Sequence, residues 1–161
     1  MDDVSLLQLA AEIGEALKSH QHLLTLAESC TGGLASATVT GIPGSSAWFD
    51  SGYVVYSNRS KQDMLGVSER TILTYGAVSE ETAREMALGA LRSGRATIAA
   101  SITGIAGPDG GTPGKPVGTV CFAWASHGGK PLSRTRVFNG DRHAIREQSV
   151  REALTNLLTL L

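Results

Sequence analysis

Residues 23–39, LLTLAESCTGGLASATV, contain a strand, a turn and a helix in direct succession. Residues 23–27 form a short apolar run, which is the pattern of a strand buried on both faces. From Leu34 onward, apolar and small residues recur at helical spacing. The small hydroxyl, thiol and glycine residues between these two segments predict a tight turn, so that the strand leads into the helix without a linker.

The rest of the chain alternates in the same way between apolar runs and helical periodicity. Helices are predicted over residues 6–20, from Ser57 and Asn58 onward, over 71–75 and 79–94, and after a cap at Asp141. Further strands are predicted over residues 48–56, 97–102, 117–125 and 133–138. Because residues 128–129 are a Gly-Gly pair, the last two strands should form an antiparallel hairpin. The pattern predicts one α/β domain over residues 1–161, a three-layer α/β/α sandwich with a mixed, mostly parallel sheet of about five strands.

Composition and charge exclude several classes of partner. With 161 residues and a formal net charge of -1, the chain has no charge excess that would hold nucleic acid or an anionic membrane. Its two cysteines, Cys30 and Cys121, form neither a disulfide framework nor a paired metal-ligand spacing. No secretory signal is visible and no apolar run has membrane-spanning length, so we expect a cytoplasmic protein.

The glycines are concentrated in one loop. Six of the 19 glycines fall within residues 104–118, directly after the predicted strand 97–102. The loop is not a P-loop, because Pro116 follows Gly114 and Lys115 where that motif requires Ser or Thr. No Gly-x-Gly-x-x-Gly follows a strand either. Since glycine lets the backbone approach a ligand closely, the amides of this loop could wrap a small ligand.

Three loops should meet at one edge of the sheet. Residues 28–33 follow the first strand, 56–61 the second and 103–111 the third. In open α/β sheets, ligands bind beyond the carboxyl ends of the strands, where the loops enter helices. If the three strands are parallel neighbours, their loops form one pocket.

The turn after the first strand offers two nucleophiles, Ser29 and Cys30. Backbone amides at a helix start can stabilise an oxyanion or hold a phosphate. A thiol there is intrinsically the better nucleophile, whereas a serine needs a base. The residues alone leave this choice open, and a structural cap of small residues is the common alternative for such a turn.

Lys61 is the candidate base. Four histidines are predicted to be surface or capping residues and not bases: His20, His22, His127 and His143. A lysine can serve instead when burial lowers its pKa far enough to leave a neutral amine. Tyr56, five positions earlier, could relay a proton or orient the amine. Taken alone, Lys61 is typical of a solvent-facing helix, so the hypothesis depends on its meeting Ser29.

Two arginines follow the cap of the last helix. Arg142, at the helix start, is a candidate clamp for a phosphate or carboxylate. Arg146 is interpreted as a solvated helix residue. No cluster of His, Cys, Asp or Glu has the spacing of metal ligands, so neither a metal nor another cofactor is expected.

Several longer blocks carry a family resemblance over nearly the whole chain. They are AESCTGG at 27–33, GSSAWF at 44–49, YSN at 56–58 with Lys61, GAVSE at 76–80, SITGIAGPDGG at 101–111, KPVGTV at 115–120 and GDR at 140–142. These blocks resemble the CinA C-terminal family, which includes stand-alone bacterial nicotinamide mononucleotide deamidases.

The resemblance implies a hydrolase that converts nicotinamide mononucleotide to nicotinate mononucleotide and ammonia through an acyl-enzyme. It implies Ser29 rather than Cys30 as nucleophile, with Lys61 as base and Tyr56 assisting. The substrate-binding residues expected on this basis are Cys30, Thr31, Gly32, Gly33, Ser46, Thr103, Gly104 and Arg142. Ser46 and Arg142 should lie near the phosphate, and amides of residues 31–33 or 103–104 should stabilise the oxyanion. The family also implies an α/β/α sandwich, no metal, and a homodimer or larger homo-oligomer.

Two other functions stay open. The chain could be a non-catalytic binding module of the same fold, linked to competence or DNA damage, although such a module has no need to keep Ser29, Tyr56 and Lys61. It could also be a Ser/Lys amidase or esterase acting on another small substrate, since substrate choice depends on the shape of the pocket.

Overall fold

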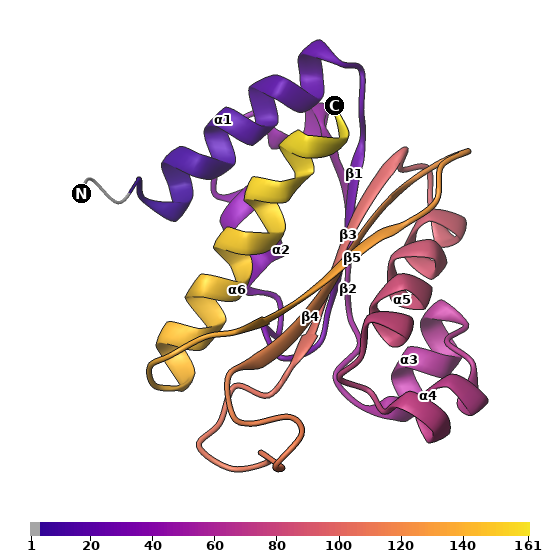
Figure 1. The fold of residues 1–161 in the computed structure, drawn as a ribbon. Helices are drawn as coiled ribbons and strands as arrows, with labels where there is room; N and C mark the ends of the chain where they lie inside the picture. Colours follow the sequence, from indigo (N-terminus) through magenta and orange to yellow (C-terminus); the bar gives the residue numbers. More distant parts are fainter. Residues whose placement is uncertain (1–3) are drawn as a thin grey trace.

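The computed structural model describes residues 4–161 and contains a five-stranded sheet between two layers of helices (Figure 1). The strands are β1 (Leu24–Glu28), β2 (Phe49–Val54), β3 (Ile98–Gly104), β4 (Thr119–Ser126) and β5 (Leu132–Val137). The helices are α1 (Leu6–Ser19), α2 (Leu34–Thr40), α3 (Asn58–Leu65), α4 (Glu69–Tyr75), α5 (Glu80–Ser93) and α6 (Arg142–Leu157). Two short 3-10 helices are η1 (Ser45–Ala47) and η2 (Leu158–Leu160). The predicted helices and strands are present, with small shifts at their ends.

The order of strands in the sheet is β2-β1-β3-β4-β5. Strand β1 pairs in parallel with β2 and with β3, whereas the pairs β3–β4 and β4–β5 are antiparallel. The predicted mixed sheet and its late hairpin are confirmed, and only β4 runs against the other strands. The carboxyl ends of β1, β2 and β3 therefore lie side by side at one edge of the sheet.

Helices cover both faces of the sheet. Figure 1 shows α1, α2 and α6 on one face and α3, α4 and α5 on the other. Strand β1 is buried along its whole length, and β3 and β4 are buried except at their last residues. Each fully buried Leu, Ile or Phe side chain contributes about 2 kcal/mol to folding, which explains the apolar runs of these central strands. No helix within residues 4–161 has the length and apolar character to cross a membrane.

Side chains cap the starts of most helices. Ser57, Ser79 and Asp141 each accept a hydrogen bond from the amide three residues later, at the starts of α3, α5 and α6. The caps predicted at Ser79 and Asp141 are confirmed. Helix α2 differs, because its N-cap is Gly33 in the left-handed conformation, which offers no side-chain acceptor. The first amides of α2 therefore need an acceptor from elsewhere in the chain.

Candidate active site

The carboxyl ends of β1, β2 and β3 open into a cavity of about 220 Å³. The predicted site residues that line it are Ser29, Cys30, Tyr56, Lys61, Thr103, Gly104 and Arg142. The three loops that were expected to converge do so. Because this volume lies below the range usual for drug-sized ligands, the cavity suits one ring-sized group, with the rest of a larger ligand outside.

Ser29 and Lys61 meet inside this cavity. Lys61 Nζ lies 3.0 Å from Ser29 Oγ, although the two residues are 32 positions apart in the chain. Lys61 Nζ also donates a hydrogen bond to the Tyr56 carbonyl at 3.0 Å, and Lys61 is only 1% exposed. Tyr56 itself is 62% exposed. The backbone carbonyl of Tyr56, and not its hydroxyl, therefore orients the amine.

Helix α3 carries Lys61 into the cavity. Ser57 begins this helix by accepting a hydrogen bond from the Ser60 amide at 3.0 Å. Lys61 and Leu65, one turn apart, are the buried residues of α3. A spacing of four residues places both on the same face of the helix, and α3 packs against α5. The apolar anchor at Leu65 thus helps to hold the lysine inside the molecule.

Burial changes the acidity of both groups beside the serine hydroxyl. Desolvation lowers the pKa of Lys61 to about 8, so about a tenth of the amine is uncharged at neutral pH, far more than at the ordinary pKa of a lysine. Burial raises the pKa of the Cys30 thiol to about 12, so that thiol stays protonated. A neutral amine beside Ser29 is the arrangement that a lysine base requires, whereas a protonated buried thiol is a poor nucleophile.

A buried glutamate holds the turn that carries Ser29. The Glu28 carboxylate is fully buried and accepts five hydrogen bonds at 2.6–3.2 Å. The donors are the amides of Gly33, Ala35 and Ser36 and the hydroxyls of Thr31 and Ser36. Glu28 is therefore the acceptor that α2 lacks at its own N-cap. Sequence reasoning missed this role, and the available signal was a helix that starts after two glycines without a capping side chain.

These hydrogen bonds leave only part of the turn free for a ligand. The Gly33 amide is bonded to the glutamate just described, and the Gly32 amide donates to the Ser29 carbonyl at 3.1 Å. Within residues 4–161, the amides of Cys30 and Thr31 have no backbone acceptor, and the Cys30 amide contacts only the thiol of its own residue. Of the three amides of residues 31–33 expected to bind an oxyanion, Thr31 is free and the other two are already engaged.

Two arginines of α6 bind backbone carbonyls of the active-site loops. Arg142 donates to the Gly107 carbonyl at 2.7 Å, and its other terminal nitrogen lies 3.4 Å from the Tyr56 hydroxyl. Arg146, one turn later, donates to the Thr31 carbonyl at 2.9 Å. The interpretation of Arg146 as a solvated residue is therefore wrong. Its spacing of four residues from Arg142, which puts both on one helix face, was the signal that could have found it.

Comparison with known proteins identifies the family. The model of the CinA C-terminal domain matches residues 6–161. The chain belongs to the CinA C-terminal domain family. Nicotinamide-nucleotide amidohydrolase PncC of Escherichia coli strain K12 is 52% identical over 157 residues, which cover 98% of this chain and 95% of that protein. The protein of the same name from Pseudomonas putida is 49% identical over 152 residues, covering 94% of each chain.

A solved structure confirms the fold of this CinA C-terminal domain. The crystal structure of the competence/damage inducible protein CihA from Agrobacterium tumefaciens superposes with a TM-score of 0.94 at 43% identity. The match covers 99% of this chain and 98% of that one. The three-layer sandwich expected from the resemblance is therefore the fold of the family.

In this CinA C-terminal domain, Ser46 does not reach the cavity. Ser46 is an exposed residue of η1, which immediately precedes β2. The cavity opens beyond the other end of β2, and each strand residue advances about 3.3 Å. The length of the strand therefore separates Ser46 from Arg142. Within one chain, the structure does not bring these two expected phosphate-binding residues together.

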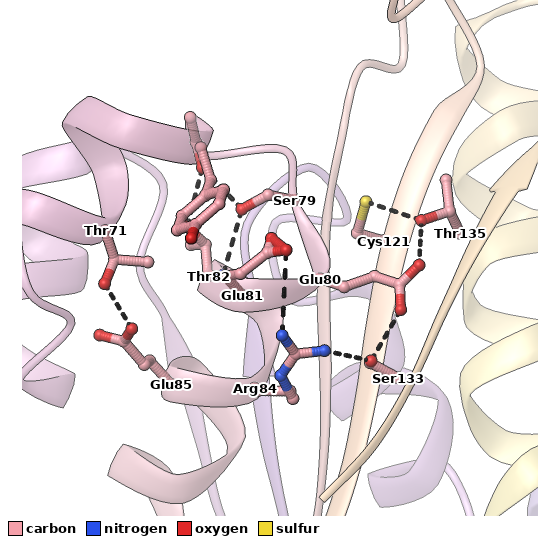
Figure 2. A network of polar contacts seen from close by, with 12 residues as sticks. Thr71, Ser79, Glu80, Glu81, Thr82, Arg84, Glu85, Cys121, Ser133 and Thr135 are labelled. Atoms are coloured by element: carbon pink, nitrogen blue, oxygen red, sulfur yellow. Dashed lines mark hydrogen bonds and ion pairs between the residues drawn. The ribbon is translucent and has the colours of Figure 1, made fainter.

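A second groove, of about 480 Å³, lies between α5, β4 and β5. Glu80 accepts hydrogen bonds from Ser133 and Thr135, drawn as dashed lines in Figure 2. Both bonds are 2.7 Å long. Arg84 donates to the Ser133 hydroxyl at 2.6 Å, and the bonds to Glu80 keep the pKa of that carboxyl below its ordinary value. Because these polar groups bind one another, the smaller cavity is the better candidate for the active site. Within residues 4–161, no group of three or more His, Cys, Asp or Glu side chains could hold a metal ion.

Proposed function

We propose that the protein is a nicotinamide-nucleotide amidohydrolase, which converts nicotinamide mononucleotide to nicotinate mononucleotide and ammonia. Two relatives that align over nearly the whole chain, from E. coli and P. putida, carry the name nicotinamide-nucleotide amidohydrolase. The observation that carries the proposal is the 3.0 Å approach of Lys61 Nζ to Ser29 Oγ in the cavity at the carboxyl ends of the strands. It supports acyl transfer with serine as nucleophile and lysine as base.

In the acylation step, the neutral amine of Lys61 removes the hydroxyl proton of Ser29. The serine oxygen forms a bond to the carboxamide carbon, and an electron pair of the carbonyl moves onto its oxygen. The carbon–nitrogen bond then breaks, and the Lys61 ammonium gives its proton to the leaving nitrogen, so ammonia departs. An ester remains on Ser29, and the lysine is neutral again.

In the second step, water hydrolyses the ester with the same lysine as base. Lys61 removes a proton from water, and the water oxygen bonds to the ester carbon. The bond to Ser29 Oγ breaks, and Lys61 returns the proton to that oxygen. The released acid ionises to a carboxylate at neutral pH. In both steps, an amide beside the nucleophile would stabilise the negative oxygen, and losing one such donor typically costs about 3 kcal/mol of barrier.

The substrate would place its pyridine ring in the cavity and its ribose phosphate outside. A cavity of about 220 Å³ has room for the ring and its carboxamide. Arg142 lines this cavity and is exposed, so its guanidinium is our candidate for the phosphate. The position of Ser46 gives no support to a phosphate-binding role for that residue within its own chain.

A non-catalytic role is the second candidate. The related A. tumefaciens structure is described as a competence/damage inducible protein. However, burying a lysine beside a serine without a counter-ion lowers stability, and this is a cost that active sites bear. A module that only binds has no use for Lys61 at this position, so the enzymatic proposal is favoured.

Ammonia release by the purified protein tests the proposal. Nicotinamide mononucleotide should yield ammonia, and Ser29→Ala and Lys61→Ala should each lower kcat by about a thousandfold or more. Cys121→Ala, which removes a free thiol away from this cavity, is the control and should keep the activity. Cys30→Ala removes the rival nucleophile but keeps its amide, so a loss as large as that of Ser29→Ala would assign the reaction to the thiol. Ammonia from other small amides only would assign a different substrate, and none from any amide would favour the non-catalytic module.

The proposal also includes the cellular compartment and the oligomeric state of the enzyme. Cys30 and Cys121 are both free thiols, which fits a reducing compartment such as the cytoplasm. The homodimer or larger homo-oligomer implied by the family resemblance stays a prediction, which light scattering of the purified protein tests.

A further inference from the structure

Arg146 contacts the nucleophile turn from the neighbouring helix layer. Its Nη2 donates a hydrogen bond to the Thr31 carbonyl at 2.9 Å, and the side chain is half-buried. The same carbonyl accepts from the Leu34 amide at 2.9 Å, so Arg146 adds a charged second donor to it. The positive charge of Arg146 also favours the ionised form of the Cys30 thiol, although burial has the larger effect on the pKa of that thiol. Because Arg146 does not line the cavity, its contribution is to the turn and not to the substrate directly.

The Thr31 carbonyl is one end of a hydrogen-bonded chain that reaches the residue after the nucleophile. In the planar trans peptide unit after Thr31, the Gly32 amide points opposite to this carbonyl. The Gly32 amide donates to the Ser29 carbonyl at 3.1 Å. In the peptide unit after Ser29, the Cys30 amide in turn points opposite to the Ser29 carbonyl. A hydrogen bond that fixes the orientation of the Thr31 carbonyl therefore helps to fix the orientation of the Cys30 N–H.

The Cys30 amide is suited to bind the developing oxyanion. It directly follows the nucleophile, lies on a residue that lines the cavity, and within residues 4–161 has no backbone acceptor, its one polar contact being the thiol of its own residue. The amide of Ser29 is not available, because it donates to the Ile102 carbonyl at 2.9 Å. Hydrogen bonds in series polarise one another, so a guanidinium at the far end of the chain strengthens the last donor.

We infer that Arg146 is a positioning residue, which orients and polarises the Cys30 amide as an oxyanion donor through the Thr31 and Ser29 carbonyls. This inference rests on the proposed acyl transfer at Ser29. It implies that Arg146 acts on the transition state, where the oxyanion exists, and leaves the binding of the ground-state substrate almost unchanged.

Three variants separate this role from a purely structural one. Arg146→Met removes the donor and keeps an apolar stem, and Arg146→Lys restores a cation that can donate one hydrogen bond. Arg151→Met is the matched control, because Arg151 lies on the same helix and donates to another backbone carbonyl, that of Val4, at 2.7 Å. For each protein we would measure the Tm, the kcat and KM for nicotinamide mononucleotide, and the rate at which a small fluorophosphonate labels Ser29.

Arg146→Met should lower kcat and the labelling rate about tenfold or more, with KM changed less than about threefold. Its Tm should match that of Arg151→Met, and Arg146→Lys should recover part of both rates. Equal kcat values in Arg146→Met and Arg151→Met would overturn the inference, as would an effect confined to KM.

The labelling rate tests the role of Arg146 separately from the proposed substrate. A wild-type protein that is labelled at Ser29 but releases no ammonia from nicotinamide mononucleotide would refute the substrate. In that case, the ratio of labelling rates between Arg146→Met and Arg151→Met still decides the role of Arg146. A wild-type protein that is neither labelled nor active would overturn both proposals.

Discussion

At Lys61, an ionisable side chain lies inside the molecule. It is 1% exposed, and within residues 4–161 no carboxylate forms an ion pair with it. Its Nζ instead contacts the hydroxyl of Ser29 and the carbonyl of Tyr56. Neither oxygen compensates for lost hydration as a carboxylate would, so the pKa of the amine falls. This low pKa is the property that a base in acyl transfer needs.

The activity of the enzyme should depend on the protonation state of Lys61. Because the pKa of Lys61 is about 8 and only its neutral form accepts a proton, kcat/KM should rise with pH through a midpoint near 8 and level off about one pH unit above it. Ammonia release measured at constant ionic strength from about pH 6 to about pH 10 gives the profile. A midpoint near about 6.5, the ordinary pKa of histidine, would indicate a different base.

The second prediction concerns stability. The pKa of Lys61 is about 8 in the folded protein and lies near its ordinary value of 10.5 in the unfolded chain. Wild-type stability should therefore rise with pH between these two values, and the cost of burying the ammonium is largest below the lower one.

Lys61→Met removes that cost, so its advantage in Tm over the wild type should be largest near neutral pH and shrink as pH rises. Lys18→Met, at an exposed position, serves as the control and should show little such dependence. A Tm difference for Lys61→Met that grows with pH would contradict the assigned burial of a cation.

At the scale of elements, the β1–α2 connection was predictable as a turn, but the way it is held was not. The apolar run of β1 and the two glycines indicate a tight turn, and Gly32 and Gly33 both have positive φ. In the sequence, Glu28 looks like an ordinary acid at a strand end. Its role depends on the start of α2 folding back over its carboxylate, which is a tertiary arrangement that no local periodicity encodes.

Glu28→Gln tests how far this connection depends on the buried carboxylate. The five hydrogen bonds all come from amides or hydroxyls, so the NH₂ group of a glutamine would face donors. We expect a loss of about 2–4 kcal/mol in the free energy of unfolding by urea. The exposed Glu147→Gln should change it by less than about 0.5 kcal/mol. Equal stability of the two variants would refute the assigned role of Glu28.

At the scale of the whole molecule, the site combines a sheet edge with helices from both layers. The meeting of Ser29 with Lys61 was predictable, because the carboxyl ends of neighbouring parallel strands share one edge. The spacing of Arg146 from Arg142 predicts that both lie on one helix face, but it predicts neither the contact of Arg146 with the Thr31 carbonyl nor the distant position of Ser46. They depend on how α6 lies across the sheet and on which end of β2 carries η1, and neither is encoded in helical or strand periodicity.

The packing of α5 against the end of α3 helps to set the position of Lys61, because α3 carries that residue. A Cβ added at Gly89 of α5 would overlap the Leu65 carbonyl at the end of α3. Gly89→Ala should therefore lower the free energy of unfolding by about 2 kcal/mol, despite the better helix propensity of alanine, and should also lower kcat. Gly129→Ala, in a loop with room for a Cβ, is the control and should change neither quantity. Unchanged stability in Gly89→Ala would show that the two helices separate freely.

Mass spectrometry of the reaction with nicotinamide mononucleotide, quenched in acid during turnover, tests the nucleophile and its base together. In the wild type, the peptide that contains Ser29 should carry the mass of a nicotinate mononucleotide ester on that serine, and Lys61→Met should show no such ester. A thioester on Cys30 instead, or continued ammonia release with Ser29 unmodified throughout, would contradict the account.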